Sequence, residues 1–491
     1  MKFRNYIYSK IIKLQAFLEK KNTIWIVLIS IVFANVLFYN ISNKTPFSTI
    51  QKRKDASGFS FHLAEKFSYF HYYTGNFPLA TLNEDLKYSI EDAESEIQEN
   101  GHNLIMEYKH WSRLGESARV LAFLPNSIIA GSPQNPSIKL FNSIVFVISL
   151  IVLYLGFWRV KKPLYGLILV VLINLTPFYL YEIYSNQNIF ALLGSVFFMI
   201  IGLNVFVLFK KEKFYYYLLL SCISGVIIGF FSEFRNEISI VLLSLILIYL
   251  FSKYLNLLKK TFIILLCFAT FFGSKQLIRY HFNKKFEKTA VLVAKAGGHV
   301  YNGKRISGHI FWHPIFCGLG DFDEDYGYEW NDKVVYRYAT PILQEKYGMD
   351  IKYSDKYHLD NYYDKDSLYY IKFDEINEYE DIVKEKVLSQ IKEDPFWYIA
   401  IIFKRVIRTL TVTIPIPYVG WLIFYVIYFF IKNRYWTYLK LLLVSLPLSA
   451  TSIIIYSGDG ATYNSVYVYF VIISMMLILY EKMQLSKLKL Q

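Results

Sequence analysis

Long apolar runs alternate with short basic turns along this chain. Ten runs of 14 to 21 residues are poor in charged side chains: 24–41, 141–158, 164–184, 189–209, 214–231, 234–251, 260–277, 418–431, 439–456 and 463–480. A helix needs roughly 20 apolar residues to span the hydrocarbon core of a bilayer, with ~17 as a lower bound. The pattern predicts an α-helical polytopic membrane protein with about ten transmembrane helices. Two runs are marginal, because 234–251 starts with charged residues and 418–431 is short.

The basic residues between the runs predict the orientation. If the N-terminus is cytoplasmic, the cytoplasmic pieces are 1–23, 159–163, 210–213, 252–260, 432–440 and 481–491. These pieces hold 21 Lys and Arg residues, whereas the three short outer turns (184–188, 232–237 and 457–463) hold one, Arg235. Cytoplasmic loops of membrane proteins carry an excess of Lys and Arg, so both termini are predicted to be cytoplasmic.

This orientation divides the chain into segments. We expect a cytoplasmic N-terminus (1–23), a first transmembrane helix (24–41), outer loop one (42–138), six transmembrane helices (141–277), outer loop two (278–395), an interfacial helix (396–417), three transmembrane helices (418–480) and a cytoplasmic C-terminus (481–491). The first run resembles a signal peptide, but no small-residue cleavage pattern follows it cleanly. We therefore interpret it as an anchor.

Residues 396–417, FWYIAIIFKRVIRTLTVTIPIP, have two interpretations. They are apolar enough for an eleventh span. However, Lys404, Arg405 and Arg408 fall on one helical face, and a span here would move the basic turn 432–440 to the outside. Both points favour an amphipathic helix that lies in the outer membrane interface.

Composition adds little to this pattern. The chain is 54% hydrophobic with a mean hydropathy of +0.29, and its net charge of +14 follows from the basic cytoplasmic turns rather than from nucleic-acid binding. Cys222 and Cys267 lie in predicted spans, which leaves Cys317 alone outside and implies no disulfide framework. No phosphate-binding loop, dinucleotide fingerprint or nucleophile elbow is present.

Charged residues gather at the predicted outer ends of the spans. They are Glu182, Glu233, Arg235, Glu237, Lys275, Arg279 and Asp459. One interpretation is a local cluster of ion pairs that caps two helices. The other is a site that binds the phosphate of a membrane lipid, because Arg pairs with phosphate oxygens through its planar fork. For this site we predict Arg235, Lys275, Arg279, Arg405 and Arg408.

The two outer loops supply further candidates. Asp55 is the first acid beyond the first span and Glu65 follows it at helical spacing; they are candidates for a general base, or else the start of an exposed helix. HIFWHPIFCGLGDFDEDYGYEWND, residues 309–332, mixes aromatic, histidine and acidic side chains. This mixture suits a sugar-binding wall, for which we predict His309, Trp312, His313 and Asp321.

Metal binding is a weaker possibility in the same stretch. Asp321, Asp323 and Asp325 alternate as in a calcium loop, but Tyr326 stands where the EF-hand needs glycine. His309 and His313 are four apart, like zinc ligands, but Pro314 and the missing glutamate of the HExxH motif argue against zinc. We therefore expect no certain cofactor, and a divalent metal remains an open alternative.

Four stretches resemble the GT-C superfamily of membrane glycosyltransferases, whose bacterial branch includes enzymes similar to the dolichyl-phosphate-mannose and aminoarabinose transferases. They are DASGFSFHLAEKFSYFHYYTGNFP, PSIKLFNSIVFVISLIVLYLGFWRVKKPLYG, GVIIGFFSEFRNEISIVLL and QIKEDPFWYIAIIFKRVIRTL. The sequence departs from the family in the next outer turn, YEIYSNQNIF. There Asn188 stands where a second acid is frequent, and Glu182 lies six residues earlier.

The resemblance implies an inverting glycosyltransferase of the bacterial inner membrane that works on its outer face. The donor would be a polyprenyl-phosphate sugar and the acceptor a cell-envelope glycan or glycolipid, with Asp55 as the catalytic carboxylate. Two alternatives are a transporter of polysaccharide or lipid-linked oligosaccharide and a polymerase of the O-antigen type. A transporter should carry charges near mid-span, whereas this sequence places them at the outer ends, which favours the enzyme.

Overall fold

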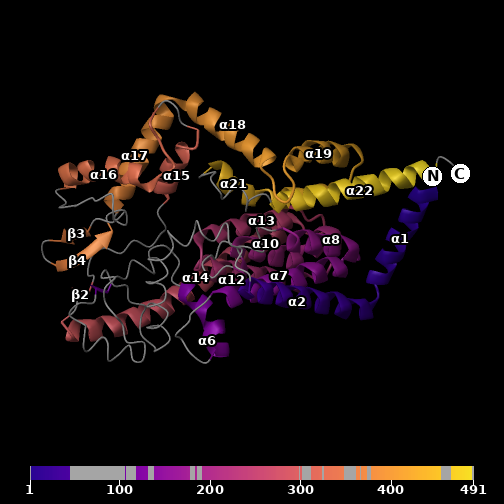
Figure 1. The fold of residues 1–491 in the computed structure, drawn as a ribbon, viewed down its shortest axis with the longest axis horizontal. Helices are drawn as coiled ribbons and strands as arrows, with labels where there is room; N and C mark the ends of the chain where they lie inside the picture. The colour runs from indigo at the N-terminus through magenta and orange to yellow at the C-terminus, as the bar shows by residue number, and fades with distance from the viewer. Residues whose placement is uncertain are drawn as a thin grey trace.

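A computed structural model provides the structure of this protein. It describes residues 2–44, 105–106, 118–130, 138–176, 183–184, 191–297, 299–300, 311–322, 326–347, 361–364, 367–372, 377–454 and 466–488. The fold is dominated by helices (Figure 1). Two short strand pairs occur in the described residues. They are β1 (Ile105–Met106) parallel to β2 (His299–Val300) and β3 (Asn361–Asp364) antiparallel to β4 (Ser367–Lys372).

The apolar runs form a helical bundle. Its elements are α2 (Lys21–Lys44), α7 (Lys139–Arg159), α8 (Pro163–Asn174), α10 (Ala191–Asn204), α11 (Phe206–Phe209), α12 (Phe214–Ser232), η3 (Asn236–Ile240), α13 (Val241–Phe251), α14 (Leu257–Lys295), η5 (Val419–Trp421), α19 (Leu422–Lys432), α20 (Trp436–Ser445), α21 (Pro447–Ile454) and α22 (Tyr467–Leu488). Two short helical elements, η2 (Arg119–Phe123) and α6 (Leu124–Ala130), precede α7.

Among the described residues, five helices are long and apolar enough to cross a membrane: Lys21–Ile41, Lys139–Arg159, Leu192–Phe209, Phe214–Ser232 and Leu257–Lys295. Four further apolar helices are shorter: Pro163–Asn174, Asn236–Phe251, Val419–Lys432 and Trp436–Ala450. Each of the ten predicted runs overlaps a helix, so the helical class of the protein is confirmed. The number of crossings stays a prediction.

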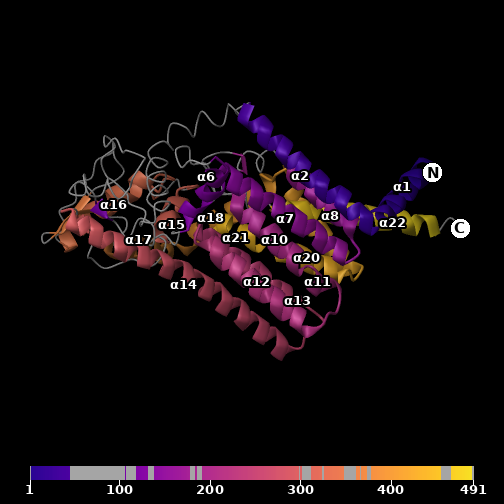
Figure 2. The same ribbon diagram turned by 90° about the horizontal axis from the view of Figure 1, so that it is seen from below.

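Close backbone contacts hold the bundle together, and Figure 2 shows its helices side by side. A Cβ atom on Gly202 of α10 would lie 2.4 Å from the carbonyl oxygen of Val152 in α7. A Cβ on Gly229 of α12 would lie 2.4 Å from the carbonyl oxygen of Phe271 in α14. Small residues let helix backbones approach closely, which is how helices associate where lipid competes for apolar side chains.

Buried polar groups inside the bundle find partners on neighbouring helices. The Tyr249 hydroxyl donates to Asn204 Oδ1 at 2.8 Å, and Asn204 Nδ2 donates to Ser224 Oγ at 2.8 Å. This chain joins α13, α10 and α12. A polar group in an apolar interior is costly unless it is hydrogen-bonded, so these bonds fix the relative rotation of the three helices.

The turns between helices separate into two ends of the bundle. At one end Arg159 and Lys210 both pair with Glu212, at 3.2 and 2.7 Å, and Lys440 Nζ donates to the Phe251 carbonyl at 2.8 Å. Helix α1 (Lys2–Leu18) and the last turns of α22 lie there too (Figures 1 and 2). We call this the terminal end. Every turn predicted to be cytoplasmic lies on it, as far as the structure describes those turns.

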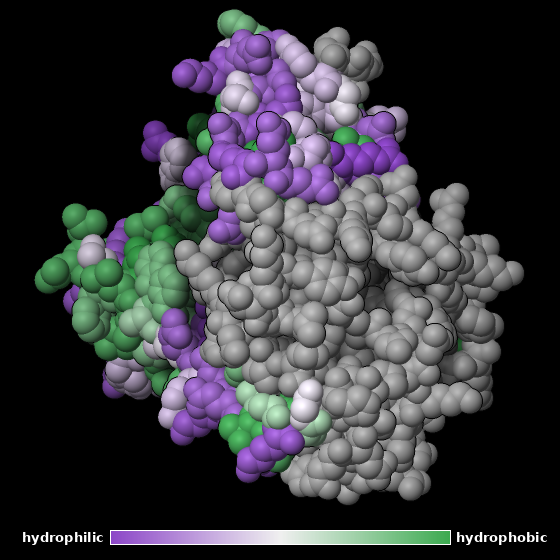
Figure 3. Space-filling model, turned by 90° about the vertical axis from the view of Figure 1, so that its left-hand side faces the viewer, coloured by the Kyte–Doolittle hydropathy of each residue, from purple (hydrophilic) through white to green (hydrophobic). Residues whose placement is uncertain are grey.

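The opposite end carries a second hydrophobic core and is called the module end. Helices α15 (Trp312–Leu319), α16 (Asp332–Tyr347) and α17 (Asn377–Glu393) pack around Phe316, Val335 and Tyr379, and we call them the three-helix module. Figure 3 looks at this end and shows hydrophilic residues gathered at its top and a hydrophobic area on one side.

Two helices have bounds that differ from those of the predicted membrane segments, whose own limits stay predictions. Helix α14 continues unbroken to Lys295, 18 residues past the predicted end of its span at 277, because residues 278–295 contain no proline or glycine to stop it. The predicted interfacial segment 396–417 is helical only as α18 (Pro395–Thr411). Asp394 starts α18 by accepting the Trp397 N–H at 3.0 Å, and Pro415 and Pro417 follow its end.

Candidate functional site

A buried carboxylate organises the bundle surface at the module end. Glu233, directly after α12, has a fully buried side chain. Arg279 Nε lies 3.2 Å and Lys275 Nζ 3.5 Å from Glu233 Oε1. Lys275 and Arg279 are four residues apart on α14, so they lie on the same face of that helix. The sequence placed all three residues at a span end, and the structure brings them into one cluster.

Arg235 forms a separate pair two residues further along. Its Nε and Nη2 donate to the two carboxylate oxygens of Glu237 at 2.7 and 2.8 Å, which is the bidentate geometry of the strongest Arg–carboxylate pairs. The local ion pairs that formed the alternative interpretation are therefore present. Glu233 pairs with Lys275 and Arg279 of α14, so these residues also tie α12 to α14.

A second cation cluster lies on α18. Arg405 Nε and Arg408 Nη2 approach Asp321 Oδ2 at 3.5 and 3.2 Å. Arg405 is fully buried and also donates to the carbonyl oxygens of Ile453 and Ile454, at 3.2 Å each, and to that of Gly318. It therefore joins α18 both to α15 and to the end of α21.

The exposed side of this cluster is aromatic. The Arg408 guanidinium lies 4.6 Å from the centre of the Phe322 ring, and Lys404 Nζ lies 5.8 Å from it. Phe396, Ile399 and Phe403 are exposed on the other side of α18. Helix α18 is therefore amphipathic, with its cations turned to the module end and an apolar face turned outward.

The five predicted phosphate-binding residues thus form three groups: Lys275 and Arg279 on α14, Arg235 directly before η3, and Arg405 and Arg408 on α18. Helix α21 contacts both α18 and η3. Within the described residues, the five cations pair with three carboxylates: Glu233, Glu237 and Asp321. Asp321 pairs with Arg405 and Arg408, and its side chain is 6% exposed; its predicted contact with a sugar stays a prediction.

Trp312 and His313 begin α15. The carboxylate of Glu380 on α17 accepts the backbone N–H groups of Phe311 and Trp312 at 3.2 and 3.1 Å and so caps this helix. Burial raises the pKa of Glu380, while its bonds to these N–H groups act in the opposite direction. Trp312 packs against the core of the three-helix module, with the Phe311 ring 5.3 Å away.

His313 points into the interior of the three-helix module. Its Nδ1 lies 2.5 Å from the Tyr379 hydroxyl and its Nε2 lies 3.0 Å from Asp332 Oδ1. Aromatic packing with Tyr336 and Tyr379 holds the ring inside the module, and the sugar-binding role of His313 stays a prediction. Pro314, which argued against a site here, falls in the first turn of α15, where proline is tolerated.

Sequence reasoning missed two neighbours of His313. Cys317, one turn further along α15, donates from Sγ to Asp332 Oδ1 at 3.8 Å. Burial, and then the Asp332 charge, raise the pKa of this thiol. His313 and Cys317 are four residues apart, and this spacing was visible in the sequence as a sign that both lie on one helix face. Asp332 lies 15 residues beyond Cys317, and only the packing of α16 on α15 brings it there.

Several candidates fall outside the described residues. They are Asp55, Glu65, Glu182, Asn188, His309, Asp323, Asp325 and Asp459. The predictions made for them stand as sequence predictions.

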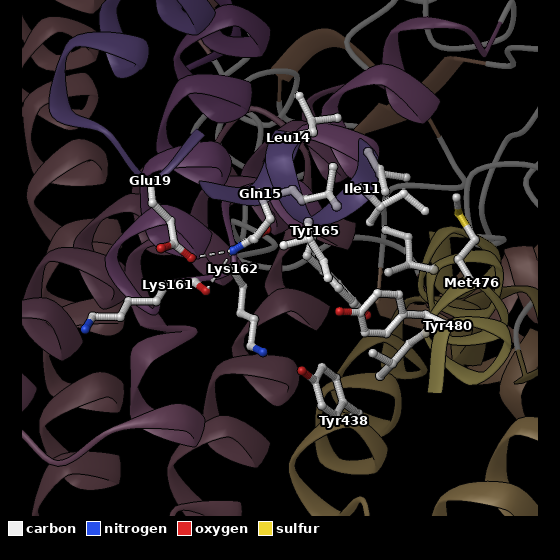
Figure 4. A pocket seen from close by; sticks show the side chains of 15 residues that line it. Ile11, Leu14, Gln15, Glu19, Lys161, Lys162, Tyr165, Tyr438, Met476 and Tyr480 are labelled. Atoms are coloured by element: carbon white, nitrogen blue, oxygen red, sulfur yellow. Dashed lines mark hydrogen bonds between the residues drawn. The ribbon is translucent and has the colours of Figure 1, made fainter. Parts of the chain in front are cut away.

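A cavity of about 570 Å³ opens at the terminal end (Figure 4). It lies between α1, α8, α20 and α22, with Ile11, Tyr438 and Tyr480 on its walls. Gln15 Nε2 donates to Glu19 Oε1 at 2.7 Å and to the Lys161 carbonyl at 3.3 Å at its edge. The cavity belongs to the opposite end of the bundle from the cation clusters, so it is no part of that site.

Comparison with protein-family models, with curated proteins and with solved structures found no match for this chain. Its class therefore follows from the fold. Five long apolar helices, packed through close glycine contacts, define a helical membrane protein.

Proposed function

We propose that this protein is a membrane glycosyltransferase that moves a sugar from a polyprenyl phosphate to a cell-envelope glycan or glycolipid. In this proposal the ten apolar runs cross a bacterial inner membrane, the basic terminal end faces the cytoplasm, and the module end faces outward. The concentration of Lys and Arg in the short turns of the terminal end supports that orientation.

One observation supports the proposal: five cations lie where apolar helices end, and three of them, Lys275, Arg279 and Arg408, keep part of their side chains exposed beside a carboxylate. A lipid phosphate lies at the headgroup level, at the boundary of hydrocarbon and water. Lys275, Arg279 and Arg408 are partly exposed, so each can exchange part of its carboxylate contact for a phosphate oxygen. Asp321 keeps Arg405 and Arg408 in position for this contact.

The proposed reaction needs no group beyond donor, acceptor and carboxylate. An acceptor hydroxyl oxygen attacks the anomeric carbon and forms the new glycosidic bond, while the bond from this carbon to the phosphate oxygen breaks. Asp55 takes the hydroxyl proton, with Glu65 as its neighbour, and the polyprenyl phosphate leaves with the bonding electrons. The cations stabilise the charge that develops on the phosphate. Attack from the opposite side inverts the anomeric configuration.

The test measures by native mass spectrometry how strongly purified variants in nanodiscs bind undecaprenyl phosphate. We expect the triple variant Glu233→Gln/Lys275→Gln/Arg279→Gln, which leaves no buried carboxylate unpaired, to bind about 10- to 100-fold more weakly, because a hydrogen bond to a charged group contributes roughly 1.5–3 kcal/mol. Lys259→Gln is the matched control. It changes the same residue type on the same helix, at the exposed terminal end. Equal loss in both variants would contradict the phosphate site.

A second arm separates an enzyme from a transporter. Asp55→Asn should bind undecaprenyl phosphate like the unchanged protein, yet cells that carry it should accumulate the lipid-linked sugar that accumulates when the gene is deleted. Asp92→Asn, in the charged stretch of the same outer loop, should restore normal levels. If Asp55→Asn also restores normal levels, Asp55 is not the base and a transport role gains support.

A further inference from the structure

Side chains from three helices converge inside the three-helix module. His313 and Cys317 lie one turn apart on α15, so they share a helix face. Asp332 is the first residue of α16, and its Oδ1 atom lies 3.0 Å from His313 Nε2 and 3.8 Å from Cys317 Sγ. The three potential ligand atoms all lie within 4.8 Å of one another.

These spacings match those around a single metal ion. Zinc binds imidazole nitrogen and carboxylate oxygen at about 2.0–2.2 Å and thiolate sulfur at about 2.3 Å. In a tetrahedral site of this size, neighbouring ligand atoms lie roughly 3.3–3.7 Å apart. The two distances from Asp332, 3.0 and 3.8 Å, bracket that range, and no pair of potential ligand atoms is more than 4.8 Å apart.

The types of ligand atom also indicate which metal would bind. Sulfur and imidazole nitrogen are borderline or soft ligands that favour zinc, whereas calcium and magnesium prefer oxygen. We propose that His313 Nε2, Cys317 Sγ and Asp332 Oδ1 bind one zinc ion, with water as the fourth ligand. This proposal does not depend on the glycosyltransferase proposal, since it involves none of the cations that would hold the lipid phosphate.

Burial gives the site a closed side and an open side. His313 and Cys317 are buried, whereas the Asp332 side chain is 65% exposed. Zinc therefore enters from the side of Asp332, and the water ligand occupies that side. Three protein ligands with one open position are the arrangement of an accessible zinc site rather than of a fully enclosed one.

Two residues of α17 position the ligands. Tyr379 Oη lies 2.5 Å from His313 Nδ1. With zinc on Nε2, the Nδ1–H group donates to Tyr379, and this fixes the tautomer and the ring orientation, as outer partners of histidine ligands do. Glu380 holds the first turn of α15 through the N–H groups of Phe311 and Trp312. Tyr379 and Glu380 are positioning residues.

Zinc would link α15 to α16 without a covalent bond between them. Binding replaces the thiol proton of Cys317, which leaves to solvent, with a metal–sulfur bond. Because the ion binds the folded module and not the separated helices, it stabilises their packing. The competing interpretation is a His313–Asp332 hydrogen bond beside an inert, buried cysteine.

The experiment measures metal in the full-length protein purified in detergent. We expect about one zinc per chain by inductively coupled plasma mass spectrometry. After removal of zinc and addition of Co²⁺ alone, a thiolate-to-cobalt charge-transfer band should appear. Cys222→Ser, a cysteine of α12 in the bundle, is the matched control and should keep both signals. Cys317→Ser should lose the band, and Asp332→Asn should lose at least half of the bound zinc.

Asp332→Asn keeps the proposal testable if Cys317→Ser does not fold, because this exposed side chain is replaced by one of nearly the same shape. Tyr379→Phe should weaken zinc binding 10- to 100-fold in chelator competition, yet keep the cobalt band. Protein that carries no zinc and gives no cobalt band would overturn the proposal in favour of the hydrogen-bonded His313–Asp332 pair. A band that persists in Cys317→Ser would also overturn it.

Discussion

Glu233 is a buried charged residue that joins two helices at the module end. Its carboxylate is fully buried and faces Lys275 and Arg279 on α14. Breaking a buried pair by removing one partner leaves an uncompensated charge, which costs more than the pair itself contributes. The same contact that could serve a lipid phosphate is therefore also a structural link between α12 and α14.

This predicts that Glu233→Gln lowers the free energy of unfolding by about 3 kcal/mol. Glu237→Gln should cost much less, because its side chain is 29% exposed and its pair with Arg235 spans only two residues. Thermal unfolding in one detergent measures both. Equal shifts of the two midpoints would contradict the structural role of Glu233.

The close approach of neighbouring helices in this bundle depends on the positions of glycine residues. Gly202 and Gly156 lie at the contact of α10 with α7, where a Cβ would meet backbone atoms. Gly273 lies on α14 with nothing within 4 Å of its ideal Cβ position. The sequence shows three similar glycines in apolar helices, and only the packing separates the first two from the third.

Gly202→Ala should therefore destabilise the bundle, because the added methyl lies 2.4 Å from a backbone carbonyl that cannot move independently of α7. Gly273→Ala should leave stability unchanged or raise it by up to about 1 kcal/mol, since glycine disfavours the helix relative to alanine. The fraction of monodisperse protein after heating compares them. The prediction fails if Gly202→Ala is as heat-resistant as Gly273→Ala.

At the scale of the whole molecule, the two ends of the bundle have different chemistry. The basic turns and the Glu212 ion pairs lie at the terminal end with α1 and the last turns of α22. The Glu233 and Asp321 clusters and the three-helix module lie at the other end (Figure 1). Helix α18 runs between the module and the bundle with an apolar outer face. Its depth in a membrane decides how many times the chain crosses.

A reporter fused after residue 435 tests this arrangement. It should read as cytoplasmic, because the turn 432–440 carries three basic residues and lies beside the turn after α13, where Lys440 bonds to the Phe251 carbonyl. A fusion after residue 300 should read as external. An external signal after residue 435 would show that α18 spans the membrane.

Parts of the candidate site could be predicted and parts could not. Lys275 and Arg279 were identifiable because charges near hydrocarbon are costly and stand out in an apolar sequence. Their partner was not, since Glu233 could equally have paired with Arg235 two residues away. Asp321 was predicted to bind a sugar because its stretch mixes aromatic, histidine and acidic residues. Its two arginine partners on α18 could not be predicted, because they lie 84 and 87 residues away.

The sequence by itself determined the helical membrane class and the separation of basic from acidic turns, because hydrophobic runs and charge placement are local properties of the chain. Only the tertiary structure decided which carboxylate faces which cation, and that Cys317 and Asp332 meet His313. These contacts join residues on different helices, and the packing of those helices depends on side-chain shape along their whole length.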